Sequence, residues 1–208
     1  MTSGCRLLLV RHGQSVWNAE GRWQGQADPP LSTLGETQAA EAATRLKGVG
    51  FTAAFASDLV RARRTAEIIA DSLGLGPVRV DPGLREINVG EWTGLTRDEI
   101  IVGWPGMLPD WSDGRIASPP GGETRAHLAD RARKALARVA TGAAPGDRLL
   151  VVSHGALIRT LDRVLTGRQV AMANLTGRWY EADEDGRLTA GQLVALADNE
   201  DTTTSPSI

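Results

Sequence analysis

The chain has 208 residues, which fits one domain, and we expect a single domain over residues 1–197 followed by a polar, disordered tail over residues 198–208. Lys and Arg number 23 and Asp and Glu 25, so the formal net charge of −2 argues against a nucleic-acid binder. The single cysteine excludes an intrachain disulfide framework.

The chain begins with an apolar run too short for a signal-peptide core. No later window approaches the ~18 consecutive apolar residues of a membrane-spanning helix. We therefore expect a cytoplasmic protein that does not bind membranes.

Short apolar runs bounded by turn residues alternate with longer segments of helical spacing. The runs predict strands at Leu7–Val10, Ala53–Ala56, Val78–Val80 and Leu149–Val152. The longer segments predict helices at Leu34–Leu46, Asp58–Leu73, Thr124–Ala140 and Gly155–Leu165. This alternation predicts an α/β fold with a mostly parallel central sheet and helices on both faces.

Two further segments are less regular. The stretch Asp81–Gly122 is rich in Gly, Pro and Trp and predicts a long loop with one short helix near Arg97–Val102. Near the C-terminus, two apolar segments on either side of Asp185 and Gly186 predict a hairpin.

Two of the three histidines directly follow the two most apolar predicted strands. The first strand runs into Arg11 and His12, and the fourth runs through Ser153 into His154 and Gly155. Ligands bind beyond the carboxyl ends of strands in such sheets, so both histidines are expected at the same edge. A glycine after each histidine allows a sharp turn and a close approach of the backbone to a ligand. This placement favours a functional role over a purely structural one.

Two charged residues are predicted at the same edge. Arg61 falls in the first turn of the helix after Ala53–Ala56, off its apolar stripe, where its guanidinium could hold an anion with two hydrogen bonds. Glu86 follows the third strand, and a carboxyl group close to histidines and arginines is a candidate general acid or base. Arg63 and Arg64 are interpreted as solvated helix surface.

Metal chemistry is not expected from the sequence. Three histidines and one cysteine offer no ligand cluster at zinc spacing, and the carboxylates show no calcium-loop pattern. We expect neither a metal nor a cofactor. His127 is assigned to a solvated, charged helix face.

Five segments, in order and at suitable spacing, resemble the histidine phosphatase superfamily, which includes the cofactor-dependent phosphoglycerate mutases and many broad phosphatases. They are LVRHGQSVWNAEGRWQGQADPPLSTLGETQA, SDLVRARRTAEIIA, LREINVGEWTGL, PPGGET and VVSHGALIR. The resemblance covers about residues 5–165 and implies a phosphoglycerate mutase-like fold.

The resemblance also implies a role for each matching residue. His12 would take the phosphoryl group as a phosphohistidine, and Glu86 would protonate the leaving alkoxide and then deprotonate water. The remaining residues would bind the phosphoryl group or complete its pocket: Arg11, Arg61, His154, Asn18, Gln24, Gly25 and Gly155.

Physical chemistry supports the same assignments. Phosphoryl transfer without a metal needs several convergent cations, and Arg11, Arg61 and a protonated His154 could supply them. His12 must present an unprotonated nitrogen, so its other nitrogen needs a hydrogen-bond acceptor such as a backbone carbonyl.

Two departures from the mutases favour a phosphatase. Related mutases usually carry Ser or Thr where this chain has Gln24, and they have a long insertion where only 34 residues separate Glu86 from Gly121. We expect hydrolysis of a small-molecule phosphate ester by a monomer or homodimer. A cofactor-dependent phosphoglycerate mutase and a catalytically weak phospho-ligand-binding module are the alternatives.

Tryptophan is over-represented among the aromatic residues. Five of the six are predicted to roof the pocket, which suggests an apolar or ring-bearing leaving group. These are Trp17, Trp23, Trp92, Trp104 and Trp111.

Overall fold

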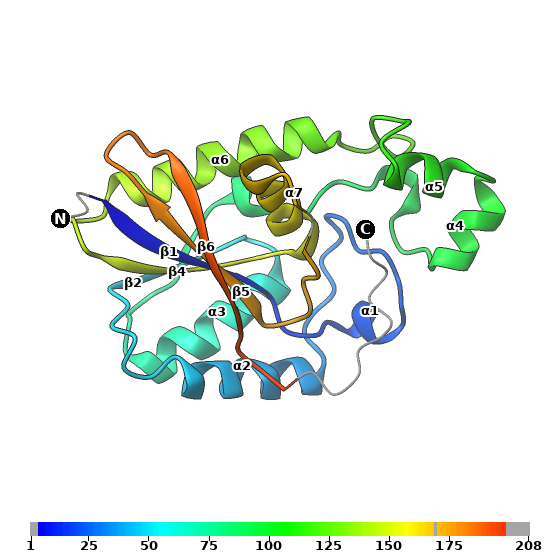
Figure 1. Ribbon diagram of the computed structural model, residues 1–208. Helices are drawn as coiled ribbons and strands as arrows, with labels where there is room; N and C mark the ends of the chain where they lie inside the picture. Colours follow the sequence, from blue (N-terminus) through cyan, green and yellow to red (C-terminus); the bar gives the residue numbers. More distant parts are fainter. Residues whose placement is uncertain (1–3, 169, 199–208) are drawn as a thin grey trace.

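A six-stranded sheet forms the centre of the computed structural model, which describes residues 4–168 and 170–198 (Figure 1). Its order is β3-β2-β4-β1-β5-β6. The strands are β1 (Cys5–Arg11), β2 (Ala53–Ala56), β3 (Arg79–Val80), β4 (Arg148–Ser153), β5 (Thr176–Ala182) and β6 (Leu188–Ala195). The expected tail, apart from Asp198, lies outside the described residues.

The sheet is mixed, so the prediction of a mostly parallel sheet is wrong in this respect. Strands β3, β2, β4 and β1 are parallel neighbours, whereas β5 pairs antiparallel with both β1 and β6. The predicted hairpin around Asp185 and Gly186 is confirmed as β5–β6. A hairpin reverses the chain without a crossover helix, so its strands are antiparallel, and it extends the sheet beyond β1.

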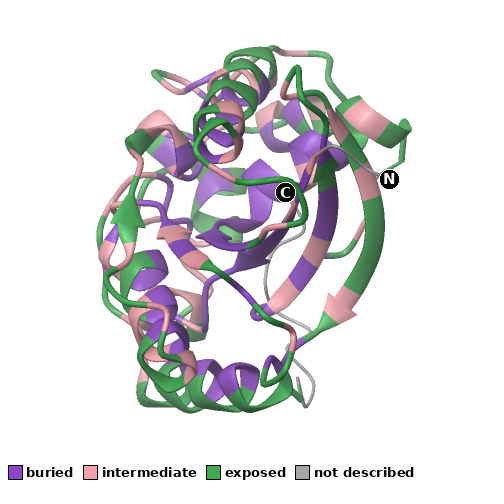
Figure 2. Cartoon of the chain, turned by 90° about the vertical axis from the view of Figure 1, so that its left-hand side faces the viewer, coloured by how far each residue is buried: buried purple, intermediate pink, exposed green. Residues whose placement is uncertain are grey.

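Helices cover both faces of the sheet, as predicted (Figure 1). One face carries α2 (Thr33–Arg45) and α3 (Val60–Leu73), and the other carries α6 (Arg125–Thr141) and α7 (Gly155–Thr166). Side chains of β1 alternate between two cores. Leu8 packs on the α2–α3 side and Leu7 on the α6–α7 side. Burial on both faces explains the uninterrupted apolar run of this strand, and Figure 2 shows the buried residues gathered between the layers.

The segment between β3 and α6 contains more regular structure than predicted. Its elements are η1 (Pro82–Leu84), η2 (Gly90–Trp92), α4 (Arg97–Gly103) and α5 (Met107–Ser112). The predicted short helix is confirmed as α4, which begins at a capping box formed by Thr96 and Glu99. Helix α5 was not predicted, because Gly106 and Pro109 resemble loop residues; in the structure Gly106 caps the helix with a positive φ of 81°.

Helices α4 and α5 extend past the sheet, near the short helix α1 (Val16–Ala19) (Figure 1). Three buried tryptophans connect this region to the loop after β1. The ring centroids of Trp23, Trp92 and Trp111 lie 5.6 to 5.8 Å apart. Within the described residues, no helix is both long and apolar enough to cross a bilayer.

Candidate active site

The structure brings the predicted site residues together at the carboxyl ends of the parallel strands. Arg11 ends β1, His12 follows it, Arg61 lies in the first turn of α3, and Glu86 follows η1. A cavity of about 50 Å³ opens among them. Of the predicted residues it is lined by Arg11, His12, Asn18, Gln24, Gly25, Arg61, Glu86 and Gly155. His154 contacts the His12 ring, at 5.1 Å between centroids, and does not itself line the cavity.

His12 has the tautomer that a nucleophile needs. Its Nδ1 lies 2.6 Å from the Gly13 carbonyl oxygen, which can only accept, so Nδ1 carries the hydrogen. Its Nε2 accepts a hydrogen bond of 3.2 Å from Arg61 Nε, which can only donate. Burial, together with the charges of Arg61 and Arg11, lowers the pKa of His12 well below its ordinary value. The expected backbone carbonyl is therefore present, and Nε2 holds an unprotonated lone pair directed at a guanidinium.

All three nitrogens of the Arg61 guanidinium group donate hydrogen bonds. Its Nη1 and Nη2 donate to the carbonyl oxygens of Ala27 and Gly25, at 2.7 and 2.9 Å. Burial lowers the pKa of Arg61 to about 10, so it stays charged at neutral pH. Gly25 has a positive φ of 51°, and a Cβ there would lie 2.7 Å from Val89 Cγ2. Glycine is therefore required for this loop to reach Arg61.

The first turn of α7 holds the carboxylate of Glu86. Glu86 Oε1 accepts from the backbone N–H groups of Ile87 and Leu157, and Oε2 accepts from that of Ala156, at 2.9 to 3.2 Å. The unpaired N–H groups and the dipole at a helix N-terminus favour an anion at this position. Because α7 begins directly after His154, one strand-to-helix junction places both His154 and Glu86.

His154 differs from the expectation of a protonated imidazole. Its side chain is fully buried, and neither ring nitrogen has a hydrogen-bond partner among the described residues. Burial lowers the pKa of His154 well below the ordinary value, and the charge of Arg61 and the electrostatic effect of His12 lower it further. The expected positive charge is therefore corrected to a neutral ring, because an imidazolium here would be desolvated beside another cation.

Arg159 was not identified from the sequence, although it lines the cavity. It lies one helical turn after Gly155 in α7, and its Nη1 would be 3.2 Å from a Cβ at that glycine. The spacing of four residues from Gly155 places both on one helix face and was the available signal. Burial lowers the pKa of Arg159, and it also lowers that of Arg11 to about 10. At neutral pH, Arg11, Arg61 and Arg159 supply positive charge. Arg22, which forms ion pairs with Glu20 and Glu99, also lines the cavity.

The sequence also did not predict two hydrogen bonds that hold the segment of Arg11 and His12 against the residues before β5. Asn174 Nδ2 donates to the His12 carbonyl oxygen at 2.8 Å, and Arg11 Nη1 donates to that of Met172 at 2.6 Å. Both come from the irregular segment before β5, where no periodicity marks a functional side chain. In the described part of the chain, no three His, Cys, Asp or Glu residues converge as a metal site would require.

The fold and the site define a class of protein. A neutral, buried imidazole with an available lone pair lies among guanidinium groups, and a carboxylate lies at the edge of the same cavity. This arrangement suits transfer of a phosphoryl group to a histidine nitrogen.

Comparison with known proteins gives the family. The chain belongs to the histidine phosphatase superfamily (branch 1), whose family model matches residues 7–180. The resemblance inferred from the five sequence motifs is thereby confirmed.

The similar proteins carry two kinds of name. A protein of Escherichia fergusonii named probable phosphoglycerate mutase GpmB is 39% identical, with 92% of each chain covered. The solved structure of a mycobacterial glucosyl-3-phosphoglycerate phosphatase is 35% identical, with a TM-score of 0.79 over 90% of this chain and 96% of that one. YhfR of Bacillus stearothermophilus is 30% identical, with a TM-score of 0.81 over 90% and 95%. The phosphatase among these neighbours fits the phosphatase interpretation of the sequence, and the GpmB name fits the mutase alternative.

Proposed function

We propose that this protein hydrolyses a small-molecule phosphate monoester through a phosphohistidine on His12. The observation that carries the proposal is the state of His12 Nε2, which is unprotonated and 3.2 Å from a guanidinium nitrogen of Arg61. A nucleophile adjacent to a cation can attack an anionic phosphoryl group, because the cation stabilises the charge on its oxygens.

The reaction takes place in two displacements. In the first, Arg61 Nε transfers its hydrogen bond from His12 to a phosphoryl oxygen, and Nε2 attacks phosphorus. The P–O ester bond breaks, and the leaving alkoxide takes the proton that the Glu86 carboxyl group carries when the substrate binds. Glu86 becomes the carboxylate that the three backbone N–H groups hold. In the second, a water oxygen attacks the phosphorus and gives a proton to Glu86. The P–N bond then breaks, its electron pair returns to Nε2, and inorganic phosphate leaves.

The mutase alternative uses the same chemistry with a second substrate hydroxyl in place of water. The name of the GpmB relatives, probable phosphoglycerate mutase, supports this alternative. The short separation between Glu86 and Gly121 and the presence of a phosphatase among the similar structures both support hydrolysis.

The test is release of inorganic phosphate from phenyl phosphate, combined with trapping of an acid-labile phosphohistidine. His12→Ala should abolish both signals, because it removes the covalent route. His127→Gln, which alters an exposed histidine, should retain them.

Two other results would contradict the proposal. Phosphate binding without release would identify a phospho-ligand-binding module. Isomerisation of phosphoglycerate that depends on a bisphosphorylated activator, and that is much faster than hydrolysis, would identify a mutase.

A further inference from the structure

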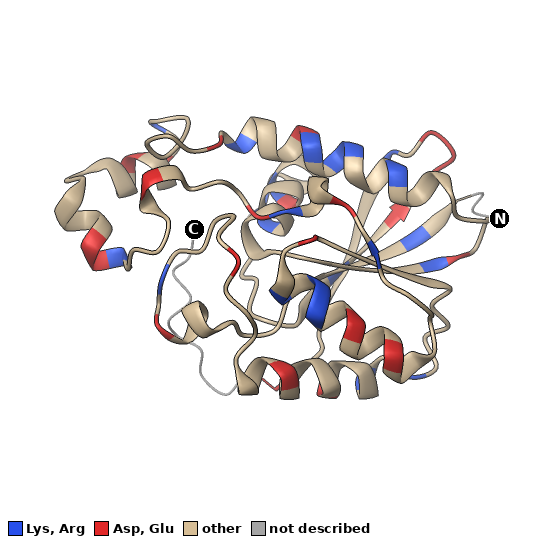
Figure 3. Ribbon diagram, turned by 180° about the vertical axis from the view of Figure 1, so that it is seen from behind, with Lys and Arg blue, Asp and Glu red and all other residues tan. Residues whose placement is uncertain are grey.

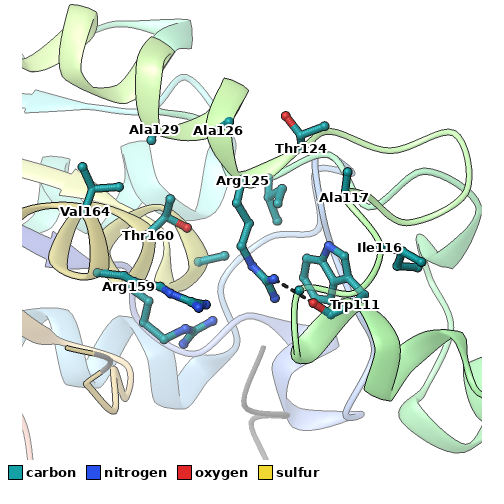
Figure 4. A pocket seen from close by; sticks show the side chains of 14 residues that line it. Trp111, Ile116, Ala117, Thr124, Arg125, Ala126, Ala129, Arg159, Thr160 and Val164 are labelled. Carbon is teal, nitrogen blue, oxygen red and sulfur yellow. Dashed lines mark hydrogen bonds between the residues drawn. The ribbon is translucent and has the colours of Figure 1, made fainter. Parts of the chain in front are cut away.

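A second, larger cavity of about 400 Å³ adjoins the catalytic cavity (Figure 4). It lies between the segment after α5, the start of α6 and one face of α7. Arg159 lines both cavities, and Ile87 and Ala156, which line the second, neighbour Glu86 and Gly155, which line the first. A leaving group attached to a phosphoryl group at His12 would therefore extend into this space.

Among the described residues, three arginines and no carboxylate line the second cavity. Figure 4 shows Arg125 and Arg159 reaching into it from α6 and α7, and Arg163 lies one turn further along α7. Arg159 Nε is buried without a hydrogen-bond partner in the described structure. Exposed Arg163 has no hydrogen bond or ion pair among the described residues. The opposite charge that acts on Arg159 is that of Glu86, which lines the catalytic cavity and not the second one.

Arg125 is held in place, and it is near enough to the other two arginines to be affected by them. Its Nη1 donates to the Trp111 carbonyl oxygen at 2.7 Å, and its guanidinium lies 4.1 Å from the Trp111 ring centroid. Burial lowers the pKa of Arg125, and so do the charges of Arg163 and Arg159. Cations that converge without an anion are an unfavourable arrangement unless a ligand supplies the opposite charge.

Apart from Thr124 and Thr160, the remainder of the wall is apolar. The cavity is bounded by the Trp111 ring, by Ile116 and Ala117 beyond α5, and by Val164 on α7. An apolar wall with a few converging charged groups is typical of a site for an organic anion.

We propose that the second cavity binds the leaving group of the substrate, and that this group has an apolar or ring-bearing body with a second anionic group, a carboxylate or a phosphate, placed among Arg125, Arg159 and Arg163. This inference rests on the proposed phosphatase function and adds the chemical class of its substrate. Arg159 lies between the two anions, whereas Arg125 and Arg163 contact the distal one alone.

The test compares matched aryl phosphates. Phenyl phosphate has no second anion, 4-carboxyphenyl phosphate has a carboxylate, and 1,4-phenylene bisphosphate has a second phosphate. We expect kcat/KM to be at least about tenfold higher for one of the two esters that carry a second anionic group than for phenyl phosphate. A hydrogen bond to a charged group typically contributes that factor or more. The ester with the larger gain identifies the second group.

Arg163→Gln is the most informative variant, because an exposed side chain without a partner can be replaced without disturbing the fold. It should reduce the preference for the favoured ester over phenyl phosphate by about tenfold. Arg133→Gln is the matched control. Arg133 is exposed on α6, lines neither cavity, and its substitution removes the same charge, so the preference should be unchanged.

The outcomes separate this inference from the proposed function. The second subsite is refuted, and the phosphatase function is kept, if phenyl phosphate is hydrolysed through His12 but kcat/KM is no higher for the two esters with a second anion. The same conclusion follows if Arg133→Gln reduces the preference for the favoured ester as much as Arg163→Gln does. If no ester is hydrolysed, the phosphatase is refuted.

If no ester is hydrolysed, the second subsite is tested by calorimetric measurement of phosphonate binding. Tighter binding of 4-carboxyphenylphosphonate or 1,4-phenylenebisphosphonate than of phenylphosphonate, weakened in Arg163→Gln, supports it. Equal binding of all three phosphonates overturns it.

Discussion

The electrostatic state of two adjacent histidines determines what the site can do. His12 and His154 are both buried, and the charges that affect them most strongly are those of arginines. Both effects disfavour the imidazolium form, so the rings stay neutral while the guanidinium groups carry the charge. The neutral His12 ring can then act as the nucleophile, while His154 packs against it as a second uncharged ring.

This arrangement predicts that the protein loses stability in mild acid. Above pH 6.5 both histidines are neutral in the folded and unfolded chains. As the pH falls below 6.5, the unfolded chain binds protons that the folded chain excludes until its lowered pKa values are reached. The free energy of unfolding should therefore drop by about 1.4 kcal/mol per histidine, or about 3 kcal/mol in all, between pH 7.5 and 5.5.

Urea unfolding at the two pH values measures this difference. The chain has three histidines, so the third provides the control. His127→Gln should leave the pH dependence intact, because His127 is exposed. Equal stability at pH 7.5 and 5.5 would show that the two buried rings are charged in the folded protein.

Glu86 gives a second prediction at the level of one side chain. Glu86→Gln keeps the shape but removes the proton donor and acceptor, and should lower kcat by about 10²- to 10⁴-fold for an alkyl phosphate. The first displacement needs no acid when the leaving group is p-nitrophenolate. With p-nitrophenyl phosphate the variant should therefore accumulate phosphohistidine, seen as a burst of nitrophenol.

Glu91→Gln, at an exposed position nearby, is the control and should behave like the unmodified protein. If Glu86→Gln slowed alkyl and p-nitrophenyl esters equally and showed no burst, Glu86 would not be the group that transfers the proton.

At the scale of the elements, the site depends on a close approach between α2 and the loop after β1. A Cβ at Gly35 would lie 2.0 Å from the Gln14 carbonyl oxygen, and one at Gly13 would lie 2.5 Å from that of Gly35. Both contacts involve backbone, which cannot move aside as a flexible side chain could. The segment that contains His12 is thereby fixed against the N-terminus of α2.

Gly35→Ala should consequently destabilise the protein by about 1–3 kcal/mol, as overpacking does, and should lower kcat by displacing the His12 loop. Gly103→Ala in α4 is the matched control, because its added methyl group would meet nothing within 4 Å. Chemical unfolding and steady-state kinetics test both variants. An unchanged midpoint for Gly35→Ala would show that this contact can relax without cost.

The elements also show where sequence reasoning succeeds. Strands β1, β2 and β4 and the four long helices were predicted from periodicity, because each buries a continuous or striped apolar surface. The short strand β3 was also predicted, although both of its residues are exposed. Helix α5 has six residues, and α1 has four, too few to show a period. The pairing of β5 with β1 depends on a tertiary contact between distant segments, for which a hairpin pattern holds no information.

At the scale of the whole molecule, the small net charge conceals a local concentration of positive charge at the catalytic cavity. Figure 3 shows acidic and basic residues interspersed along the outer helices. Arg11, Arg61 and Arg159 instead converge on one cavity, where Glu86 is the single carboxylate among the described residues. The sequence identified Arg11 and Arg61 by their places after strands. Arg159 and the neutral state of His154 depend on burial, which only the assembled fold reveals.

The tryptophan expectation is only partly met by the assembled molecule. Trp23 lines the catalytic cavity and Trp111 the second one, while Trp92 is fully buried against the other two rings. Trp104 packs against the core and lines neither of the two cavities. The clustered rings therefore contribute packing as well as a cavity wall.

Trp111→Ala should lower the free energy of unfolding by about 3–5 kcal/mol, since it empties the space of a fully buried ring. It should also raise KM, because it removes the ring against which the Arg125 guanidinium packs, 4.1 Å from the ring centroid. Trp104→Ala should cost clearly less, as Trp104 is only partly buried. Equal losses in urea unfolding would contradict the central position of Trp111.

The three-tryptophan cluster has a consequence for how such proteins diversify. It fastens the segment between Glu86 and Gly121 at Trp92 and Trp111, while residues such as Val102, 80% exposed, face solvent. Substitutions in the segment after Trp111, which supplies Gly114, Ile116 and Ala117 to the second cavity, can remodel that cavity without moving His12 or Arg61. A lineage built on this scaffold can thus acquire new substrates while it inherits its phosphoryl-transfer chemistry unchanged.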